Sequence, residues 1–335
     1  TMSATQLATY RLLDPMTDTA KQTAAQNIAT NSSQPGGVAD KRPWAWLVLL
    51  FLGVAWGLSF SLARMSTEGG AHPLGINYWV SLIGALLLLV VNSFKGRRLP
   101  LKKNYLFLYV ICGLLGSIIP GILYFYAASR VTAGVLAITV ATVPLMTFIG
   151  AAILRVEKIS IMRMLGVLFG IFSVVLLVAP NESLPDSAAT PWVLIVILAA
   201  LCYTAENLII ALRMPTGANP FVIVTGMLLA ATLMMTPAVW LTGTFEPLTW
   251  PLGRPGWAIL GMAAISVIAY GLFLYLVMYA GPVFASQTAY VVTLSGVLWG
   301  ILIFGESHSL WIWLSLVTMM VALSLVKPRT GARPG

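Results

Sequence analysis

Charged residues are scarce in this chain. Only 9% of its 335 residues are charged, and just ten are acidic. A soluble domain carries about 25% charged residues and about 45–50% apolar ones, whereas 59% of this chain is hydrophobic. The scarcity of charge argues against a water-soluble globular protein and predicts a membrane protein.

Histidine and cysteine are almost absent, with two residues of each. Neither H-E-x-x-H nor G-x-S-x-G occurs, and His72 and His308 fall at the ends of apolar runs. The metal ligands or nucleophiles that an intramembrane enzyme needs are therefore missing, and we expect no enzyme activity, no metal and no cofactor. Cys112 and Cys202 lie in different apolar runs, so we expect them to be unpaired and to pack as small apolar residues.

Long apolar runs fill most of the chain. A membrane span needs roughly 20 apolar residues to cross a hydrocarbon core of about 30 Å. Punctuation by Gly, Pro and charged residues separates ten such runs, at 44–64, 73–93, 104–128, 131–154, 160–179, 191–212, 219–242, 257–280, 283–304 and 308–326. The sequence therefore predicts an all-α polytopic membrane protein with ten transmembrane helices.

The basic residues predict the orientation of these helices. If the N-terminus is cytoplasmic, sixteen of the nineteen Lys and Arg residues face the cytoplasm, and only Arg64, Arg130 and Arg254 do not. By the positive-inside rule, both termini are predicted to be cytoplasmic. We expect residues 1–43 to be a disordered cytoplasmic tail, because they are polar and contain no apolar segment, and residues 327–335 to be a short C-terminal tail.

Topology also explains the net charge of +9. We therefore expect membrane lipid, rather than nucleic acid, to be the partner of the basic loops. The chain is expected to act as a monomer.

Two segments repeat along the chain. "ILRVEKIS", Ile153 to Ser160, and "IFGESHS", Ile303 to Ser309, each end an apolar run with a glutamate, and Glu157 and Glu306 are 149 positions apart. The same offset pairs Tyr126 with Tyr275, so residues 44–180 and 190–326 are predicted to be two five-helix repeats. Five is odd, so the second repeat must be inverted, as in many secondary transporters. We expect each glutamate to cap the helix that follows it; a gating ion pair is the alternative.

A known family shares these features. "AGVLAITVATVPLMTFIGAAILRVEKIS" (Ala133 to Ser160) and "ASQTAYVVTLSGVLWGILIFGESHS" (Ala285 to Ser309) resemble the two halves of EamA-type transporters of the drug/metabolite transporter superfamily. The second stretch is most similar to the aromatic amino-acid exporters among them. The resemblance covers about 44–326. It implies a central cavity in an inner-membrane protein, with alternating access by rocking and bending of helices.

Polar residues inside the apolar runs are the candidate substrate site, because polar groups within a membrane usually face the interior of the bundle. Glu206 is the one acidic residue deep in a run, and Tyr203 and Asn207 share its helix face at helical spacing. The candidates are Trp56, Tyr78, Trp79, Tyr124, Tyr203, Glu206, Asn207, Tyr270, Ser286, Gln287 and Tyr290. The alternatives are hydroxyls that bond their own helix, aromatic rings that pack against lipid or a neighbouring helix, and a structural role for Glu206.

Two positions are predicted hinges. Pro144 removes a backbone hydrogen bond from the fourth run, and Ser295-Gly296 supplies freedom in the ninth. The lack of Lys or Arg at mid-membrane disfavours phosphates and nucleotide sugars as substrates. We expect export of small metabolites, foremost amino acids with aromatic or other neutral side chains. Proton-coupled export of lipophilic solutes through Glu206 is the alternative, and a membrane enzyme is a distant one.

Overall fold

The computed structural model describes residues 43–68, 70–155, 157, 159–179, 189–215, 217–280 and 282–326. The chain before Pro43 and residues 327–335, the predicted tails, lie outside these residues. Within the described part, eight helices have the length and composition to cross a membrane, and two shorter apolar helices, Thr288–Phe304 and Leu310–Leu325, accompany them. The predicted all-helical membrane fold is confirmed.

The helices follow the predicted spans to within a few residues. The first half contains α3 (Pro43–Ser66), α4 (Pro73–Phe94), α5 (Lys103–Gly113), η2 (Leu114–Ile118), α6 (Ile119–Ala128), α7 (Ala133–Val140), α8 (Val143–Ile153) and α9 (Ile161–Val178). The second half contains α10 (Thr190–Arg213), α11 (Pro220–Leu241), α12 (Arg254–Ala280), α13 (Pro282–Ala285), α14 (Thr288–Phe304) and α15 (Leu310–Leu325). Proline starts α4 and α11, where its missing N–H costs no helical hydrogen bond.

The fourth and ninth spans are interrupted at different places. The fourth breaks at Ala141 and Thr142, between α7 and α8, because Pro144 cannot donate to the carbonyl of Val140. The ninth is interrupted between α13 and α14, whereas α14 runs unbroken through Ser295 and Gly296. Ser295 instead packs against α3, where its hydroxyl donates to a backbone carbonyl 2.9 Å away.

The third span contains one wide turn. Residues Leu114–Ile118 form a π-helical segment, η2, between α5 and α6. Pro120 follows it and cannot donate to the carbonyl of Gly116, so regular helix is weakened at this point. The side chain of Asn77, from α4, donates a hydrogen bond of 3.0 Å to the carbonyl of Ser117 and so satisfies one backbone acceptor of the segment.

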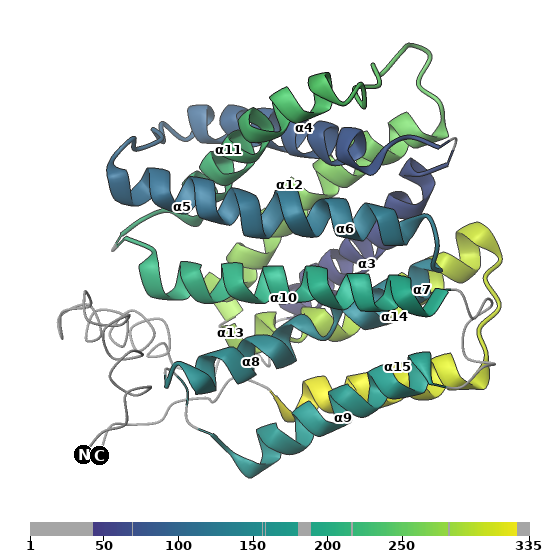
Figure 1. The fold of residues 1–335 in the computed structure, drawn as a ribbon. Helices are drawn as coiled ribbons and strands as arrows, with labels where there is room; N and C mark the ends of the chain where they lie inside the picture. Colours follow the sequence, from purple (N-terminus) through teal and green to yellow (C-terminus); the bar gives the residue numbers. More distant parts are fainter. Residues whose placement is uncertain are drawn as a thin grey trace, which may run out of the picture.

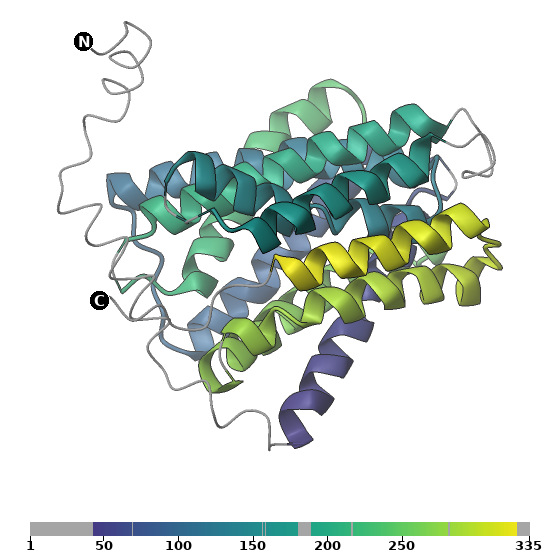
Figure 2. The same ribbon diagram turned by 90° about the horizontal axis from the view of Figure 1, so that it is seen from below.

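The helices pack as two interlocked halves with matching contacts. In the second half α12 and α14 pack against α3, and in the first half α6, α7 and α8 pack against α10 in the same way. Two pairs join equivalent helices of the halves: α4 lies against α11, and α9 lies against α15 along one edge of the molecule (Figures 1 and 2).

The α9–α15 pair shows the inversion directly. Ser173 in α9 and Ser315 in α15 each donate a hydrogen bond to the other's carbonyl, at 2.7 and 2.8 Å. Nearer the start of α9, Gly166 lies against Ala322, near the end of α15. The two helices are therefore antiparallel. At an offset of 149, Gly166 is equivalent to Ser315 and Ser173 is equivalent to Ala322. The contact between Gly166 and Ala322 is therefore equivalent to the contact between Ser315 and Ser173. The repeats are thus related by an approximate two-fold axis.

Candidate functional site

A cavity of about 740 Å³ lies between the two halves. Every one of the ten spans contributes to its wall except α9. Most of the wall is apolar, and its aromatic members among the described residues are Trp56, Phe60, Tyr124, Phe125, Tyr203, Phe273 and Tyr290. A few polar groups in a largely aromatic cavity are typical of sites for small organic molecules.

Glu206 is the only ionisable group other than tyrosine in the described wall. The wall contains no Lys, Arg or His among the residues that the structure describes. The carboxylate of Glu206 lies directly against Gly116 in η2, and a methyl group on Gly116 would overlap it. The π-helical turn and a residue without a side chain thus let the backbone of the third span approach the carboxylate.

Hydroxyl and amide groups surround the same space. Asn207 follows Glu206 on α10, and Ser59 reaches the wall from α3. The hydroxyls of Ser59 and Thr288 are buried and have no hydrogen-bond partner within the described part of the chain. Buried hydroxyls are normally satisfied, so water or a bound solute is expected to complete their hydrogen bonds.

The structure brings most of the predicted residues to this cavity. Those in its wall are Trp56, Tyr124, Tyr203, Glu206, Asn207, Ser286 and Tyr290, together with Pro144. Sequence reasoning passed over Gly116 and Ser117 of η2, although a proline four residues after Gly116 was a readable signal for irregular helix. It also missed Phe60 and Thr288, which no local pattern distinguishes from packing residues.

Four predicted residues lie outside the wall. Trp79 lines a separate pocket of about 230 Å³. Its indole N–H donates a hydrogen bond of 2.8 Å to the carbonyl of Glu246. The ring of Tyr78 contacts that of Phe245. Tyr270 packs its ring on a phenylalanine of α11, and Gln287 precedes the first residue of α14.

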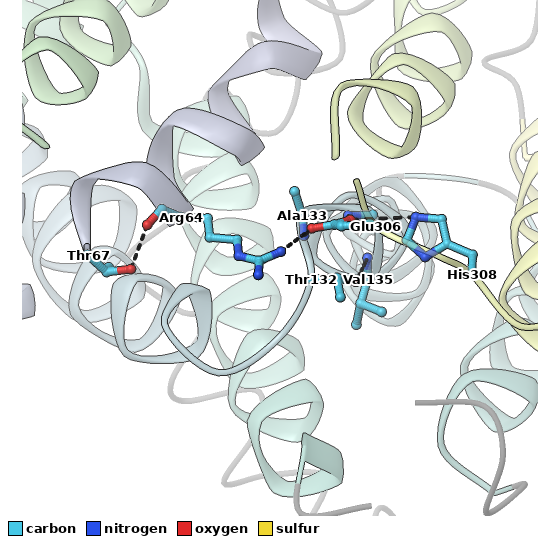
Figure 3. Close-up of polar contacts among 8 residues, drawn as sticks. Arg64, Thr67, Thr132, Ala133, Val135, Glu306 and His308 are labelled. Atoms are coloured by element: carbon cyan, nitrogen blue, oxygen red, sulfur yellow. Dashed lines mark hydrogen bonds and ion pairs between the residues drawn. The ribbon is translucent and has the colours of Figure 1, made fainter. Parts of the chain in front are cut away.

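The two repeated glutamates have different partners. Glu306 accepts backbone hydrogen bonds from Ala133, at 2.8 Å, and Gly134, at 3.3 Å, at the start of α7. It also pairs with Arg64 of α3 (Figure 3). The expectation that it caps the helix following it, α15, is wrong: it caps a helix of the other half. Glu157 pairs with Arg163 of α9.

His308 lies beside this ion pair, in the connection between α14 and α15. Its side chain is fully buried, and its Nε2 is 3.5 Å from the carboxylate of Glu306. Burial lowers the pKa of His308, and the nearby carboxylate of Glu306 partly opposes that shift. The imidazole therefore favours its neutral form more strongly than a histidine in water does.

Comparison with known proteins agrees with this architecture. The EamA-like transporter family matches residues 43–179 and 190–327, once for each half. Uncharacterized inner membrane transporter YedA of Escherichia coli strain K12 is 27% identical over 280 residues, which are 83% of this chain and 89% of YedA. YedA of Escherichia coli O157:H7 matches equally well. The curated relatives found in this way do not include the aromatic amino-acid exporter YddG, to which the resemblance of the second half pointed.

A solved structure shares the fold. It is described only as the crystal structure of a protein, and it superposes with a TM-score of 0.58 at 20% sequence identity. The match covers 85% of this chain and 96% of the other. At this identity the likeness concerns the fold alone.

Proposed function

The chain belongs to the EamA-like transporter family, and from that premise we propose that it exports small amphipathic metabolites, foremost amino acids with aromatic or other neutral side chains. It is a membrane transporter and not an enzyme. The proposed route is the central cavity, which opens alternately to the two sides of the membrane. The proposed location is the inner membrane, with both termini in the cytoplasm and one chain as the working unit.

One observation supports this substrate class above all. Among the described residues, the cavity wall combines a single carboxylate, Glu206, with seven aromatic side chains, and it has no Lys, Arg or His. A phosphate or nucleotide sugar would bring negative charge into a site that offers no cation to offset it. A solute with an ammonium group and an apolar side chain suits the wall better, because the ammonium can pair with Glu206 and contact aromatic faces.

The remaining polar groups fit the other end of an amino acid. The amide of Asn207 and the hydroxyls of Ser59 and Thr288 lie in the same wall, and they can donate hydrogen bonds to a carboxylate. The rings of Trp56, Tyr203 and Tyr290 supply apolar area for the side chain of the solute.

Coupling is proposed to be absent. Among the described residues of the cavity wall, Glu206 has no second carboxyl to relay a proton, so we favour a facilitator that lets accumulated amino acid leave down its own gradient. The second candidate is proton-coupled export of lipophilic cations, with Glu206 as the coupling site. The described wall contains no Lys, Arg or His that would repel a cationic solute, and this observation favours the second candidate.

Counterflow in proteoliposomes tests both. We expect uptake of labelled phenylalanine and leucine to exceed uptake of tetraphenylphosphonium and of a nucleotide sugar, and Glu206→Gln to abolish it. Glu246→Gln is the matched control, because Glu246 is an exposed carboxylate outside the cavity. Uptake of tetraphenylphosphonium alone would overturn the amino-acid proposal. Concentration of amino acid against its gradient when a pH gradient is imposed, lost in Glu206→Gln, would overturn the facilitator.

A further inference from the structure

One end of the molecule contains a buried carboxylate. We call it the Glu306 end, and it contains the last turns of α3, the start of α7 and the connection from α14 to α15. The side chain of Glu306 is only 3% exposed. It contacts the guanidinium of Arg64 and accepts from the first N–H groups of α7 (Figure 3). Three spans, the first, fourth and ninth, are thereby tied together at one point.

The backbone there is shaped for this contact. Gly305 ends α14 in the left-handed conformation, with φ of 64°, and the N–H of Glu306 donates 3.4 Å to the carbonyl of Gly300. The carboxylate rests on Gly300, where a methyl group would overlap it. This turn and this glycine fold the side chain back toward α3 and α7.

The opposite end, which we call the Glu157 end, carries the same parts without the contact. The N–H of Glu157 donates a hydrogen bond of 3.3 Å to the carbonyl of Ala151, which repeats the Glu306–Gly300 hydrogen bond at an offset of 149. Arg213 is the basic residue in the last turn of α10, as Arg64 is in the last turn of α3. Yet Glu157 is 41% exposed and pairs with Arg163. Arg213 is exposed and makes no ion pair within the described part of the chain.

An inverted repeat relates the two states of a transporter. When the two halves exchange conformations, each residue acquires the surroundings that its counterpart had before. In this structure the first half supplies Arg64 and the second supplies Glu306. In the exchanged state the second half supplies Arg213 and the first supplies Glu157. Opening the Glu306 end would therefore break one ion pair and close the other.

We infer that Arg64–Glu306 and Arg213–Glu157 are alternating gates: the first closes the Glu306 end in the state seen here, and the second closes the Glu157 end in the opposite state. The inference rests on the proposed alternating-access function. It assigns Arg213 a gating role that its exposed position here does not reveal. Arg163 holds Glu157 while the Glu157 end is open, so Glu157 changes partner once in each cycle.

Accessibility of the cavity tests the inference without any substrate. Ser266 lines the cavity and is exposed, so Ser266→Cys is a conservative reporter once Cys112 and Cys202 are replaced by alanine. Its labelling by an impermeant thiol reagent is measured from each face in oriented vesicles. A second reporter, Thr242→Cys in the exposed loop after α11, identifies the face to which the Glu306 end belongs.

The two gates predict opposite results. From the Glu306 face, we expect Glu306→Gln and Arg64→Gln to increase the labelling rate about tenfold, because they weaken the closed state. We expect Arg213→Gln to decrease it several-fold, because it removes a contact of the opposite state only. Glu68→Gln is the matched control, since it removes the exposed ion pair of Glu68 with Arg254 and should leave the rate unchanged.

A general loss of folding cannot produce this pattern, because it does not change sign between variants. If Arg213→Gln labels like Glu68→Gln, the exchange is wrong. If Glu306→Gln and Arg64→Gln leave the rate unchanged, the gate at the Glu306 end is wrong as well. The labelling needs no transported solute, so a failed amino-acid counterflow would reject the proposed substrate and leave this result intact.

Discussion

The Glu306 end and the Glu157 end share one backbone hydrogen bond but differ in their side-chain contacts. Both glutamates donate their N–H to equivalent carbonyls, of Gly300 and Ala151, but only Glu306 is buried and shared among three spans. The two ends differ in state, as inferred above, and also in the residues at equivalent positions. The residue equivalent to Gly300 is Ala151. A methyl group at the position of Gly300 would overlap the Glu306 carboxylate, and Ala151 has such a methyl group. Ala133, which donates its N–H to Glu306, is replaced by Pro282, which has none.

A third difference is electrostatic. The guanidinium of Arg64 lies 4.4 Å from the ring centre of Phe304, and the residue equivalent to Phe304 is Arg155. Glu157 is surrounded in sequence by three basic residues, Arg155, Lys158 and Arg163. Arg213 must therefore compete with them for the Glu157 carboxylate, whereas Arg64 has no such competitors in the sequence around Glu306. A repeated backbone thus supplies the frame of a gate, while a few side chains decide how tightly each gate closes.

Gly300→Ala should have the largest effect on stability, because it acts on the feature in which the two ends differ. Its methyl group would displace the Glu306 carboxylate, which leaves Arg64 and the start of α7 without their acceptor. We expect the free energy of unfolding to fall by about 2–3 kcal/mol, measured by denaturation in lipid micelles. Gly271→Ala is the control, because a methyl group there meets only ordinary contacts with Phe221. Equal losses in both variants would contradict the packing argument.

Substitution of the glutamates should also lower the free energy of unfolding more at the Glu306 end than at the Glu157 end. We expect Glu306→Gln to cost about 1–2 kcal/mol of unfolding free energy, because it weakens a buried charged acceptor. Glu157→Gln should cost about 0.5 kcal/mol or less, because its ion pair is partly exposed and screened. Double-mutant cycles of each glutamate with its arginine measure the coupling. A larger coupling for Glu157 with Arg163 would reverse our ranking of the two ends.

The α9–α15 interface contrasts with the two glutamate ends, because here the two halves make matching contacts. Ser173 and Ser315 make reciprocal hydrogen bonds, so Ser173→Ala and Ser315→Ala should destabilise equally, by about 0.6 kcal/mol for each bond lost. Ser324→Ala serves as control, since that exposed hydroxyl bonds its own helix. Unequal effects of Ser173→Ala and Ser315→Ala would show that the two-fold relation does not extend to the energetics.

The smallest effect concerns pH at the Glu306 end. Burial lowers the pKa of His308, so below its unfolded value of about 6.5 the unfolded chain binds more protons and stability falls as pH decreases. Above that pH its contribution is constant. Glu306 and Arg64 are the charged groups nearby. We expect this dependence to be lost in His308→Phe, as measured by melting curves between pH 5.5 and 7.5. Identical slopes in both proteins would refute the assignment.

Much of the fold could be predicted from the sequence because its signals are local. Apolar runs set the spans, and proline marked the starts of α4 and α11. The fourth span is interrupted at Ala141 and Thr142, close to Pro144, whereas the hinge predicted at Pro144 stays a prediction. The candidate site was predicted less completely. Tyr203, Glu206 and Asn207 share a helix face, which a periodic pattern reveals, whereas Trp79 and Tyr270 look equally suitable in sequence and lie outside the cavity wall.

The sequence by itself determined ten apolar spans, two five-helix repeats and therefore an inverted second half, because apolar length and the parity of five can be counted along a chain. Only the tertiary structure decided which glutamate is buried. Glu306 meets Arg64 from 242 positions away and Ala133 from 173, and it can do so because Gly300 leaves room for its carboxylate. Such a contact depends on the shape of packed surfaces from distant segments, which no local pattern encodes.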